Sequence, residues 1–390
     1  MVWLVTNGRL QRRALAPWTP MKRILLVGPV PPPFGGIASV MEDILSSDLS
    51  RDYEIEVLSG PVPYPQWART TLTRSLFRIW WLVAFLGRLI ARRYDVAHIQ
   101  SSGSGFLGNA VYALLARLTS AKVLFHLHGT DWDYFYTSAP PTRRRLIRWG
   151  LALPHCIVVL YSLWADKLRA IGLKQPIAVA RNFVHDEPQP ERSLILQTRE
   201  ELGLRDSDFI VLFVGSVGWR KGVFDILKAV PLVAAEDQSI RFVLAGGEED
   251  PGEMEQILGI VRTERLERWV TALGEIERST VPALLGLAEL FLLPSHIEGM
   301  PISIIEALRS GVPVVSTPVG AIPEMIEDHV SGILVTPGQP VRIAQAVLEL
   351  RRDDSLRARV GAAGRGVFLE KFEYSKGIDE IRALYQSLAS

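Results

Sequence analysis

The stretch LFLLPSHIEGMPISIIEAL, residues 290–308, decides how this 390-residue chain folds. It opens with a four-residue apolar run, the length of a short buried strand, and closes with a helix, because Pro301 suits the first helical turn. The loop between them carries Glu298 and Gly299. A strand, a loop and a helix in this order form the repeating unit of an α/β domain with a parallel sheet.

The same alternation extends through the rest of the chain. Apolar runs of strand length, with helical stretches between them, occur at residues 23–28, 53–58, 96–99, 122–126, 156–160, 209–214, 240–245, 270–273 and 313–316. Long helices are expected at about 340–353 and 355–372, and the polar segment 186–191, with two prolines, is typical of a linker. The sequence therefore predicts two doubly wound, Rossmann-like domains with parallel sheets that face each other across a cleft, where such folds bind ligands.

Length and composition agree with this organisation. We place the two domains at residues 21–187 and 188–372, with residues 1–20 as a disordered lead and 373–390 as a closing helix. Hydrophobic residues make up 48 % and charged residues 22 % of the chain, which excludes a disordered, collagen-like or heptad-repeat protein. The single cysteine, Cys156, excludes an intramolecular disulfide and indicates a reducing compartment.

The net charge of +1 hides a division between the two halves. Up to Pro188 there are 22 Lys and Arg against 12 Asp and Glu, a net of +10, whereas beyond it there are 21 against 30, a net of −9. This asymmetry suggests that the first half meets an anionic partner: phosphate, a membrane surface or nucleic acid. The longest apolar run, residues 79–87, is about half of the ~20 residues that a spanning helix needs, so we expect a soluble or peripheral protein.

Two loops of the first domain carry candidate site residues. Gly35 and Gly36 follow the first strand and precede a helix, where glycines let the backbone approach a diphosphate; a plain tight turn is an equal alternative. His128 follows a buried strand and is predicted to face the cleft, whereas His126 is better explained as a buried structural residue. The Asp-x-Asp spacing at residues 131–133 resembles a metal-binding pair, but nothing nearby completes a cage, so no metal is expected.

The second domain adds two stronger signals. Arg220 and Lys221 follow Gly215 and precede a helix, where the helix dipole disfavours cations by about 0.3–1 kcal/mol each. We interpret this pair as a phosphate-binding site. The alternative is that both residues are solvated surface cations. Glu298 and Glu306 are eight residues apart, and no structural task is evident for Glu298 at the entrance of the helix.

Together these motifs resemble the retaining glycosyltransferases of family 4, which have the GT-B fold, and among them the bacterial polysaccharide and glycolipid type. The likeness runs from about Met21 to Tyr385, and the E-x7-E pair is its most specific part. The matching residues are Gly35-Gly36, His128-Gly129, Gly215 with Lys221-Gly222, Ala245-Gly246-Gly247, Glu298 with Glu306, Gly311-x-Pro313 and Gly320-Ala321-Ile-Pro-Glu324.

The resemblance implies a role for each matching residue. Glu298 would meet hydroxyls of the donor sugar beside the reacting carbon, and His128 would meet the same sugar from the other domain. Lys221 would hold the diphosphate and Glu306 the ribose hydroxyls of a nucleotide-diphosphate sugar. The backbone around the diphosphate would be that of Gly36, Gly299, Met300, Pro301 and Ile302. Such enzymes usually need no metal or other cofactor, and their last helix, here residues 373–390, returns to the N-terminal, acceptor-side domain.

One departure from the family pattern bears on the donor site. The family commonly has an arginine where this chain has Ser216, so Arg220 would have to take part of that role or donor affinity would be lower. A milder change is Ala321 in place of a frequent glycine. Two alternatives from other classes stay open: a catalytically silent nucleotide-sugar-binding subunit, and a GT-B epimerase or phosphorylase. The resemblance favours retaining transfer by front-face attack, in which the leaving phosphate deprotonates the acceptor.

The helix expected at residues 71–94 suggests where the acceptor comes from. At 100° per residue one stripe mixes arginines with aromatics, which suits an anionic membrane surface. That stripe consists of Arg74, Arg78, Trp81, Phe85, Arg88 and Arg92, and the opposite face, expected to pack on the sheet, of Leu76, Ile79, Val83, Gly87, Ile90 and Tyr94. A second basic patch holds Arg143, Arg144, Arg145 and Arg148 beside Trp149.

A solvated amphipathic helix is the alternative to this membrane-contact stripe. Nucleic acid is not expected as a partner, because no recognition motif accompanies the charge. The sequence thus predicts a cytoplasmic enzyme, peripheral on the inner face of the membrane. Its acceptor would be a saccharide, lipid-linked as in a growing surface polysaccharide.

Overall fold

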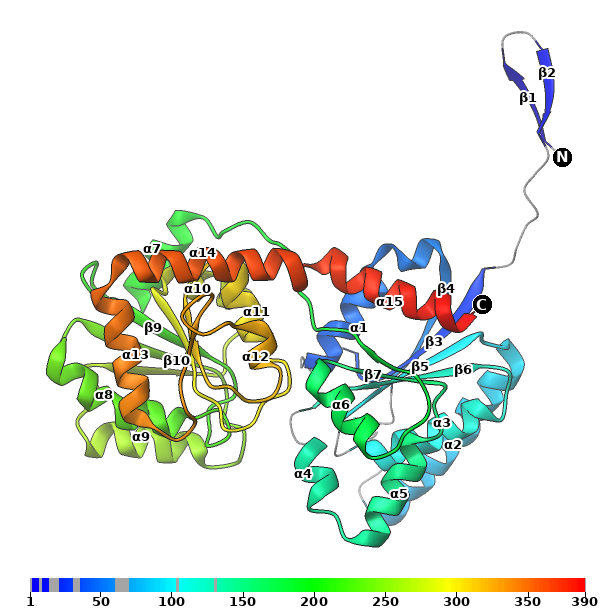
Figure 1. The fold of residues 1–390 in the computed structure, drawn as a ribbon, viewed down its shortest axis with the longest axis horizontal. Helices are drawn as coiled ribbons and strands as arrows, with labels where there is room; N and C mark the ends of the chain where they lie inside the picture. The colour runs from blue at the N-terminus through cyan, green and yellow to red at the C-terminus, as the bar shows by residue number, and fades with distance from the viewer. Residues whose placement is uncertain are drawn as a thin grey trace.

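The computed structural model describes residues 2–6, 9–13, 21–30, 36–59, 70–102, 105–129 and 132–389. Two α/β lobes lie side by side (Figure 1), each built on a six-stranded parallel sheet, and this confirms the predicted fold class. Away from both sheets, β1 (Val2–Thr6) and β2 (Arg9–Arg13) pair antiparallel. These ten residues are thus a hairpin within the segment for which the sequence suggested a disordered lead.

The N-terminal sheet has the strand order β4-β3-β5-β6-β7-β8. Its strands are β3 (Lys22–Val27), β4 (Tyr53–Leu58), β5 (Val96–Ser101), β6 (Lys122–Leu127), β7 (Cys156–Val159) and β8 (Ile177–Val179). Because successive side chains of a strand point to opposite faces, Leu25 and Val27 enter one hydrophobic cluster while Ile24 and Leu26 enter another. Both faces are therefore buried, as the near-continuous apolar strands predict.

Helices cover both faces of this sheet. The face of Leu25 carries α2 (Thr71–Arg92), α3 (Phe106–Arg117), α5 (Pro141–Leu151) and α6 (Ser162–Ala170). The face of Ile24 carries α1 (Gly36–Ser46) and α15 (Tyr374–Ala389). Two shorter helices are the 3-10 turn η1 (Asp48–Arg51) and α4 (Trp132–Thr137).

The C-terminal sheet has the order β11-β10-β9-β12-β13-β14. Its strands are β9 (Phe209–Val214), β10 (Ile240–Ala245), β11 (Val270–Gly274), β12 (Leu290–Leu293), β13 (Val314–Ser316) and β14 (Ile333–Leu334). The order reverses between β9 and β12, so the loops that leave these two strands diverge and open a crevice at the carboxyl edge of the sheet. Its helices are α7 (Arg192–Glu201), α8 (Val223–Glu236), α9 (Glu253–Thr263), η2 (Arg278–Thr280), α10 (Val281–Leu287), α11 (Ile302–Arg309), α12 (Ile322–Met325), α13 (Pro340–Arg352) and α14 (Asp354–Lys371).

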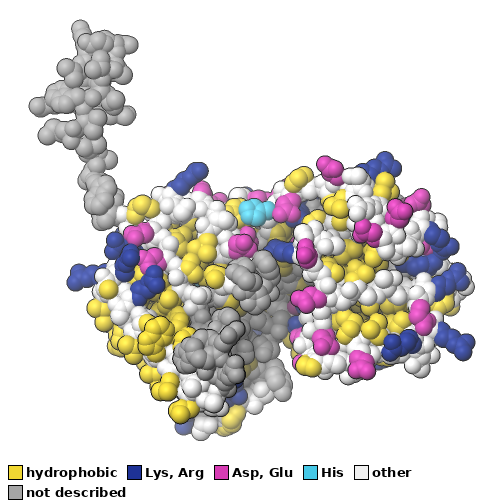
Figure 2. Space-filling view, turned by 180° about the vertical axis from the view of Figure 1, so that it is seen from behind, with side chains coloured by type: hydrophobic (Ala, Val, Ile, Leu, Met, Phe, Trp, Pro, Cys, Tyr) yellow, Lys and Arg dark blue, Asp and Glu magenta, His cyan; other side chains and the backbone are white. Residues whose placement is uncertain are grey.

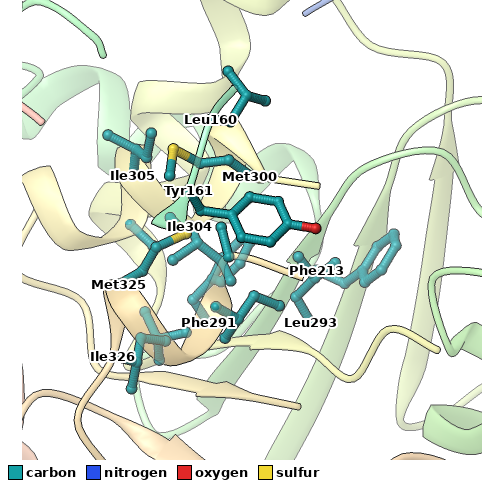
Figure 3. Packing of buried hydrophobic residues seen from close by; sticks show 14 of the residues in the cluster. Leu160, Tyr161, Phe213, Phe291, Leu293, Met300, Ile304, Ile305, Met325 and Ile326 are labelled. Atoms are coloured by element: carbon teal, nitrogen blue, oxygen red, sulfur yellow. The ribbon is translucent and has the colours of Figure 1, made fainter. Parts of the chain in front are cut away.

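The two lobes share a hydrophobic contact. Leu160 and Tyr161, just after β7, pack around Met300 at the entrance of α11 (Figure 3). Next to this contact Glu324 of the C-terminal lobe accepts hydrogen bonds from the backbone N–H groups of Ser162 and Leu163, at 2.8 and 3.2 Å. The carboxylate thereby satisfies two of the unpaired N–H groups that every helix has at its N-terminus, here those of α6.

The chain crosses between the lobes twice: first between β8 and α7, and again where α14 ends and α15 begins. The backbone N–H of Val184, in the first crossing, donates to the carbonyl of Phe372 in the second, at 3.1 Å. Beyond this point α15 buries Ile378, Ile381 and Tyr385 against the N-terminal sheet. The C-terminal helix of the chain therefore packs on the N-terminal lobe (Figure 1).

Helix α2 is rotated relative to the prediction, which is wrong for its apolar residues. Trp81 and Phe85 are buried, 9 % and 1 % exposed, and stack near Tyr112 of α3 with ring centroids 5.2 and 5.1 Å away. Large aromatic side chains bury the most apolar area, so they take the inner face. Of the residues that were expected to pack on the sheet, Tyr94, just beyond the helix, is buried as predicted. Four others are instead more than half exposed, namely Leu76, Ile79, Val83 and Ile90.

Arg74, Arg88 and Arg92 of α2 are exposed, and two of them form ion pairs. Arg88 and Arg92 pair with Glu56 of β4, with N–O distances of 2.8 and 2.9 Å. Arg74 lies on the exposed surface, and the side chain of Arg78 lies outside the described residues. The stripe predicted for membrane contact is thus divided between buried aromatics and arginines bound to the protein's own carboxylate.

Candidate active site at the carboxyl edges of the two sheets

Two loops at the switch point of the C-terminal sheet are held against each other. The first, residues 215–222, follows β9, and the second, residues 294–301, follows β12. Gly222 begins α8 with a φ of 77°, and a side chain there would collide with the carbonyl oxygen of Pro294. Only glycine combines this backbone conformation with so close an approach. The contact brings the residues before Gly222 next to those after Pro294.

Charged side chains meet where these loops touch. Lys221 Nζ forms an ion pair with Glu298 Oε1, and Ser295 Oγ donates to the same oxygen at 3.0 Å. Arg220 Nη1 lies 4.0 Å from the other oxygen, Glu298 Oε2. The side chain of Glu298 is 2 % exposed and that of Lys221 12 %. The structure therefore brings together three of the four charged residues that the sequence singled out in the second domain, and it corrects the expectation that Glu298 has no structural task.

A second carboxylate, which sequence reasoning missed, completes this group. Glu249, in the loop after β10, pairs with Arg220 Nε. The hydroxyl of Ser216, which replaces the family's arginine, lies 3.5 Å from Glu249 Oε2. The pairing joins residues 29 positions apart on different loops. Nothing in the local sequence signals such a pair.

His128 lies at the carboxyl edge of the N-terminal sheet, directly after β6. Its backbone N–H donates to the carbonyl of Ser101 at 2.7 Å, and the side chain is buried. Nε2 lies 2.5 Å from Gln100 Oε1. Because an amide oxygen only accepts, Nε2 carries the proton and Nδ1 keeps its lone pair. Burial lowers the pKa of His128 to about 3, so the imidazole is neutral at physiological pH.

A buried polar chain continues from His128 to the C-terminal helix. Gln100 Nε2 lies 3.1 Å from His98 Nε2, and His98 Nδ1 lies 2.8 Å from Tyr385 Oη. His126, stacked between the other two histidines, is buried as the sequence suggested, and its Nε2 has no hydrogen-bond partner among the described residues. Gln100 was missed by sequence reasoning, although the polar residues at 98 and 100 in an otherwise apolar strand are a signal.

Glu306 borders a separate cavity between the lobes. The cavity measures about 280 Å³, and its charged lining comprises Asp43, His185, Glu187, Arg278, Glu306 and Arg309. Burial raises the pKa of Glu306, and Arg278, 3.8 Å away, partly opposes the rise. Arg278 also donates across the lobe boundary to Ser39 Oγ of α1, at 2.7 Å. A buried carboxylate at a cavity wall beside one arginine can accept hydrogen bonds from hydroxyl groups.

The segment before α11 is fixed from both lobes. Pro301 is the N-cap of the helix, so Ile302 is its first residue. Asn182, in the first crossing, donates through Nδ2 to the carbonyl of Met300 at 2.9 Å. Gly299 accepts from the backbone N–H of Ala321 at 2.8 Å. Sequence reasoning placed the helix start correctly but missed Asn182, which lies 118 residues from Met300.

Several predicted site residues lie apart from this group or outside the described residues. Gly35 lies outside them, and Gly36 is the first residue of α1. Gly215 directly follows β9 and donates its N–H to the carbonyl of Ala245 at 3.0 Å. Among the residues that the structure describes, no group of three or more His, Cys, Asp or Glu side chains could hold a metal ion. Asp131 and the side chain of Asp133 lie outside that range.

The fold and the site define a class: a two-lobed GT-B protein with cations at the switch point of its C-terminal sheet. Comparison with known families agrees. The model for glycosyl transferases group 1 matches residues 195–367, and the 4-like glycosyl transferase domain matches residues 39–182. The alpha-D-kanosaminyltransferase of Streptomyces kanamyceticus is 30 % identical over 304 residues, 75 % of this chain and 77 % of that protein. The chain therefore belongs to the family-4 type of GT-B glycosyltransferases.

A further relative and a solved structure extend the comparison. The N-acetyl-alpha-D-glucosaminyl L-malate synthase of Bacillus anthracis is 26 % identical over 295 residues, 75 % of this chain and 74 % of that protein. The crystal structure of Anabaena HepE with UDP and glucose superimposes with a TM-score of 0.74 at 18 % identity, covering 94 % of this chain and all of that one. At that identity the match supports the fold alone.

Proposed function

We propose that this glycosyltransferase moves a sugar from a nucleotide-diphosphate sugar to a saccharide acceptor with retention of the anomeric configuration. The observation that carries the proposal is the contact of Lys221 and Arg220 with Glu298 at the switch point. Cations beside a carboxylate at that place suit a ligand with a diphosphate and a neighbouring sugar. HepE, which shares the fold, was solved with UDP and glucose, a nucleotide and a sugar of the classes that this proposal assigns to the donor.

Each site residue then has a task in the reaction. Breaking the bond from sugar to phosphate builds positive charge on the sugar and negative charge on the leaving diphosphate. Lys221, Arg220 and the N-terminus of α11 stabilise the diphosphate, and preorganised donors of this kind contribute about 3–4 kcal/mol each. Glu298 and the neutral His128 hold the donor sugar from opposite lobes. Glu306 accepts the ribose hydroxyls in the cavity that it borders.

Two further features belong to this proposal. The reaction needs no metal, because Lys221 and Arg220 supply the positive charge that a divalent cation would supply. Attack occurs on the face from which the diphosphate leaves, and the leaving phosphate accepts the proton of the acceptor hydroxyl. The acceptor is a lipid-linked saccharide of surface polysaccharide or glycolipid synthesis, so the enzyme works at the cytoplasmic face of a membrane.

Product analysis with one labelled donor, in excess chelator, tests the proposal. The wild type should form a glycoside with the anomeric configuration of its donor, measured by NMR coupling at the anomeric proton. Lys221→Met should lower the rate by a factor of roughly 10²–10³. Lys228→Met, at an exposed lysine of the neighbouring helix α8, is the matched control and should leave the rate unchanged. An inverted product, or equal rates for both variants, would overturn the assignment.

The same assay separates the alternatives. A silent binding subunit, to which Ser216 beside Glu249 gives some support, would bind a nucleotide sugar without turnover. An epimerase would change the donor without an acceptor, and a phosphorylase would need inorganic phosphate.

A further inference from the structure

The outer face of α2 is a broad apolar surface with no protein packed on it in the described part of the chain. Its large side chains are 56–69 % exposed, and at 100° per residue they fall within a stripe about 100° wide. The stripe consists of Leu72, Leu76, Ile79, Trp80, Val83 and Ile90. A monomeric soluble protein rarely exposes so continuous an apolar patch unless something binds there.

The stripe continues over the neighbouring helices. Helix α3 packs between α2 and α5, and Leu107 of α3 and Leu118, just beyond its end, are 36 % and 73 % exposed. On α5 Leu146 and Trp149 are 45 % and 46 % exposed. Figure 2 shows hydrophobic side chains gathered on the side of the N-terminal lobe where Figure 1 places these helices. We call the outer surface of α2, α3 and α5 the α2–α5 face.

The charge of this face is of one sign. Helix α5 carries four arginines and α3 one, and α2, α3 and α5 contain no aspartate or glutamate. The arginines of α2 do not belong to this face, because at 100° per residue they fall on the side of the helix opposite its apolar stripe, where Arg88 and Arg92 pair with Glu56. A cavity of about 640 Å³ at the end of α5 adds to the charge of the face, because Arg117, Arg148 and Lys174 line the cavity next to Trp149. No carboxylate lines this cavity. An apolar surface flanked only by cations matches a lipid bilayer with anionic headgroups.

We propose that the α2–α5 face inserts into the surface of an anionic phospholipid bilayer, with the α2 stripe among the acyl chains and the α5 arginines on lipid phosphates. A second copy of this chain is a poor alternative, because a two-fold contact would place arginines against arginines with no carboxylate to pair them. No described helix is long and apolar enough to cross a bilayer. Binding at the bilayer surface does not require a spanning helix, because it needs only exposed apolar side chains that can enter the bilayer.

The position of the face relative to the cleft fits this arrangement. Helices α2 and α3 follow strands β4 and β5, so each begins at the carboxyl edge of the sheet, where the cleft lies. The proposal goes beyond the transfer reaction and can fail without it, because binding to lipid is measured without donor or acceptor.

Co-sedimentation with vesicles is the decisive experiment. The wild type should bind vesicles of phosphatidylcholine with phosphatidylglycerol at least about tenfold more tightly than vesicles of phosphatidylcholine alone. The triple variant Leu76→Gln, Ile79→Gln, Val83→Gln should lose binding by about a hundredfold, because three side chains no longer enter the bilayer. The control Leu232→Gln, Leu258→Gln changes exposed leucines of α8 and α9 and should bind as the wild type does.

The other outcomes are as informative. An unchanged melting temperature shows that the triple variant is folded, and unchanged hydrolysis of the donor shows that its active site is intact. A variant with Arg143, Arg145 and Arg148 changed to glutamine should lose the preference for anionic vesicles. Absence of wild-type binding, equal loss in the control, or self-association that only the triple variant abolishes would overturn the proposal.

Discussion

Replacing either partner of the Lys221–Glu298 pair should reduce both the stability of the protein and its transfer rate. The side chains are 12 % and 2 % exposed, so removal of one charge leaves the other away from water. Removing one partner of a buried pair costs about 3–5 kcal/mol of unfolding free energy. For Lys221→Met we expect about 2–3 kcal/mol, below the centre of that range, because Arg220 lies 4.0 Å from Glu298 and Ser295 also donates to it.

Glu298→Gln should cost about 3 kcal/mol. The amide oxygen still accepts from Ser295 Oγ, but Lys221 Nζ loses its carboxylate. In the double variant neither charge is left unpaired, so the total loss should be smaller than the sum of the two by about 2 kcal/mol. Urea denaturation of all four proteins, followed by circular dichroism, measures this coupling.

Transfer rates separate the structural effect from the catalytic one. Both single variants and the double variant should lose transfer by a factor of about 10²–10³, although the double variant loses less stability than the two single variants together. Glu236→Gln is the control, since its pair with Arg352 is 57 % and 62 % exposed and should contribute less than about 0.5 kcal/mol. Strictly additive losses of stability, or a Glu298→Gln protein with wild-type turnover, would refute the reasoning.

Three further predictions concern the histidines and the metal. Gln100→Leu removes the acceptor that fixes His128 and should lower the transfer rate about tenfold, whereas Gln100→Glu, which keeps an acceptor, should restore most of it. Burial lowers the pKa of His98 and His128 to about 3, below the value near 6.5 of an unfolded chain. Between these two values the unfolded state binds more protons, so the unfolding free energy should fall as the pH drops below about 6.5, by up to about 1.4 kcal/mol per pH unit and histidine. The test measures the urea midpoints of the wild type and of His98→Asn at pH 7.5 and 5.5. The midpoint should fall more between these pH values in the wild type than in the variant, because both proteins share the contribution of the carboxylates. An equal fall in both proteins would contradict the prediction. Finally, transfer should continue in excess chelator, and a loss that only manganese or magnesium restores would show that the site needs a metal.

Strand and loop positions were predictable because they depend on local sequence. The run at residues 209–214, the glycine that begins α8 and the proline before α11 each act within a few residues. The order of the strands in the sheets follows from the rules for parallel α/β folds. For this reason the sequence was sufficient to predict the two lobes and to place Arg220, Lys221 and Glu298 on loops that face one cleft.

Pairings between distant residues were not predictable in the same way. No structural task was evident for Glu298 in the sequence, yet it pairs with a lysine 77 positions earlier, and Arg220 pairs with Glu249. Helix α2 shows a different limit. It has apolar residues on both sides, so periodicity gave two possible inner faces, and only the fit of Trp81 and Phe85 against α3 selects one.

The sequence has an excess of positive charge in its first half. A phosphate-binding site would be the obvious explanation, but the structure places most of this charge elsewhere. At the donor site both cations are already paired, Lys221 with Glu298 and Arg220 with Glu249, so this region adds no net positive charge. The excess of the first half instead resides largely on α2, α3 and α5, three helices without a carboxylate. Pairing with the protein's own carboxylates occurs at both places, because Arg88 and Arg92 of α2 bind Glu56 as Lys221 binds Glu298. The charge asymmetry therefore resides mainly on these three helices rather than at the switch point, and the bilayer contact proposed above would draw on the arginines of α5.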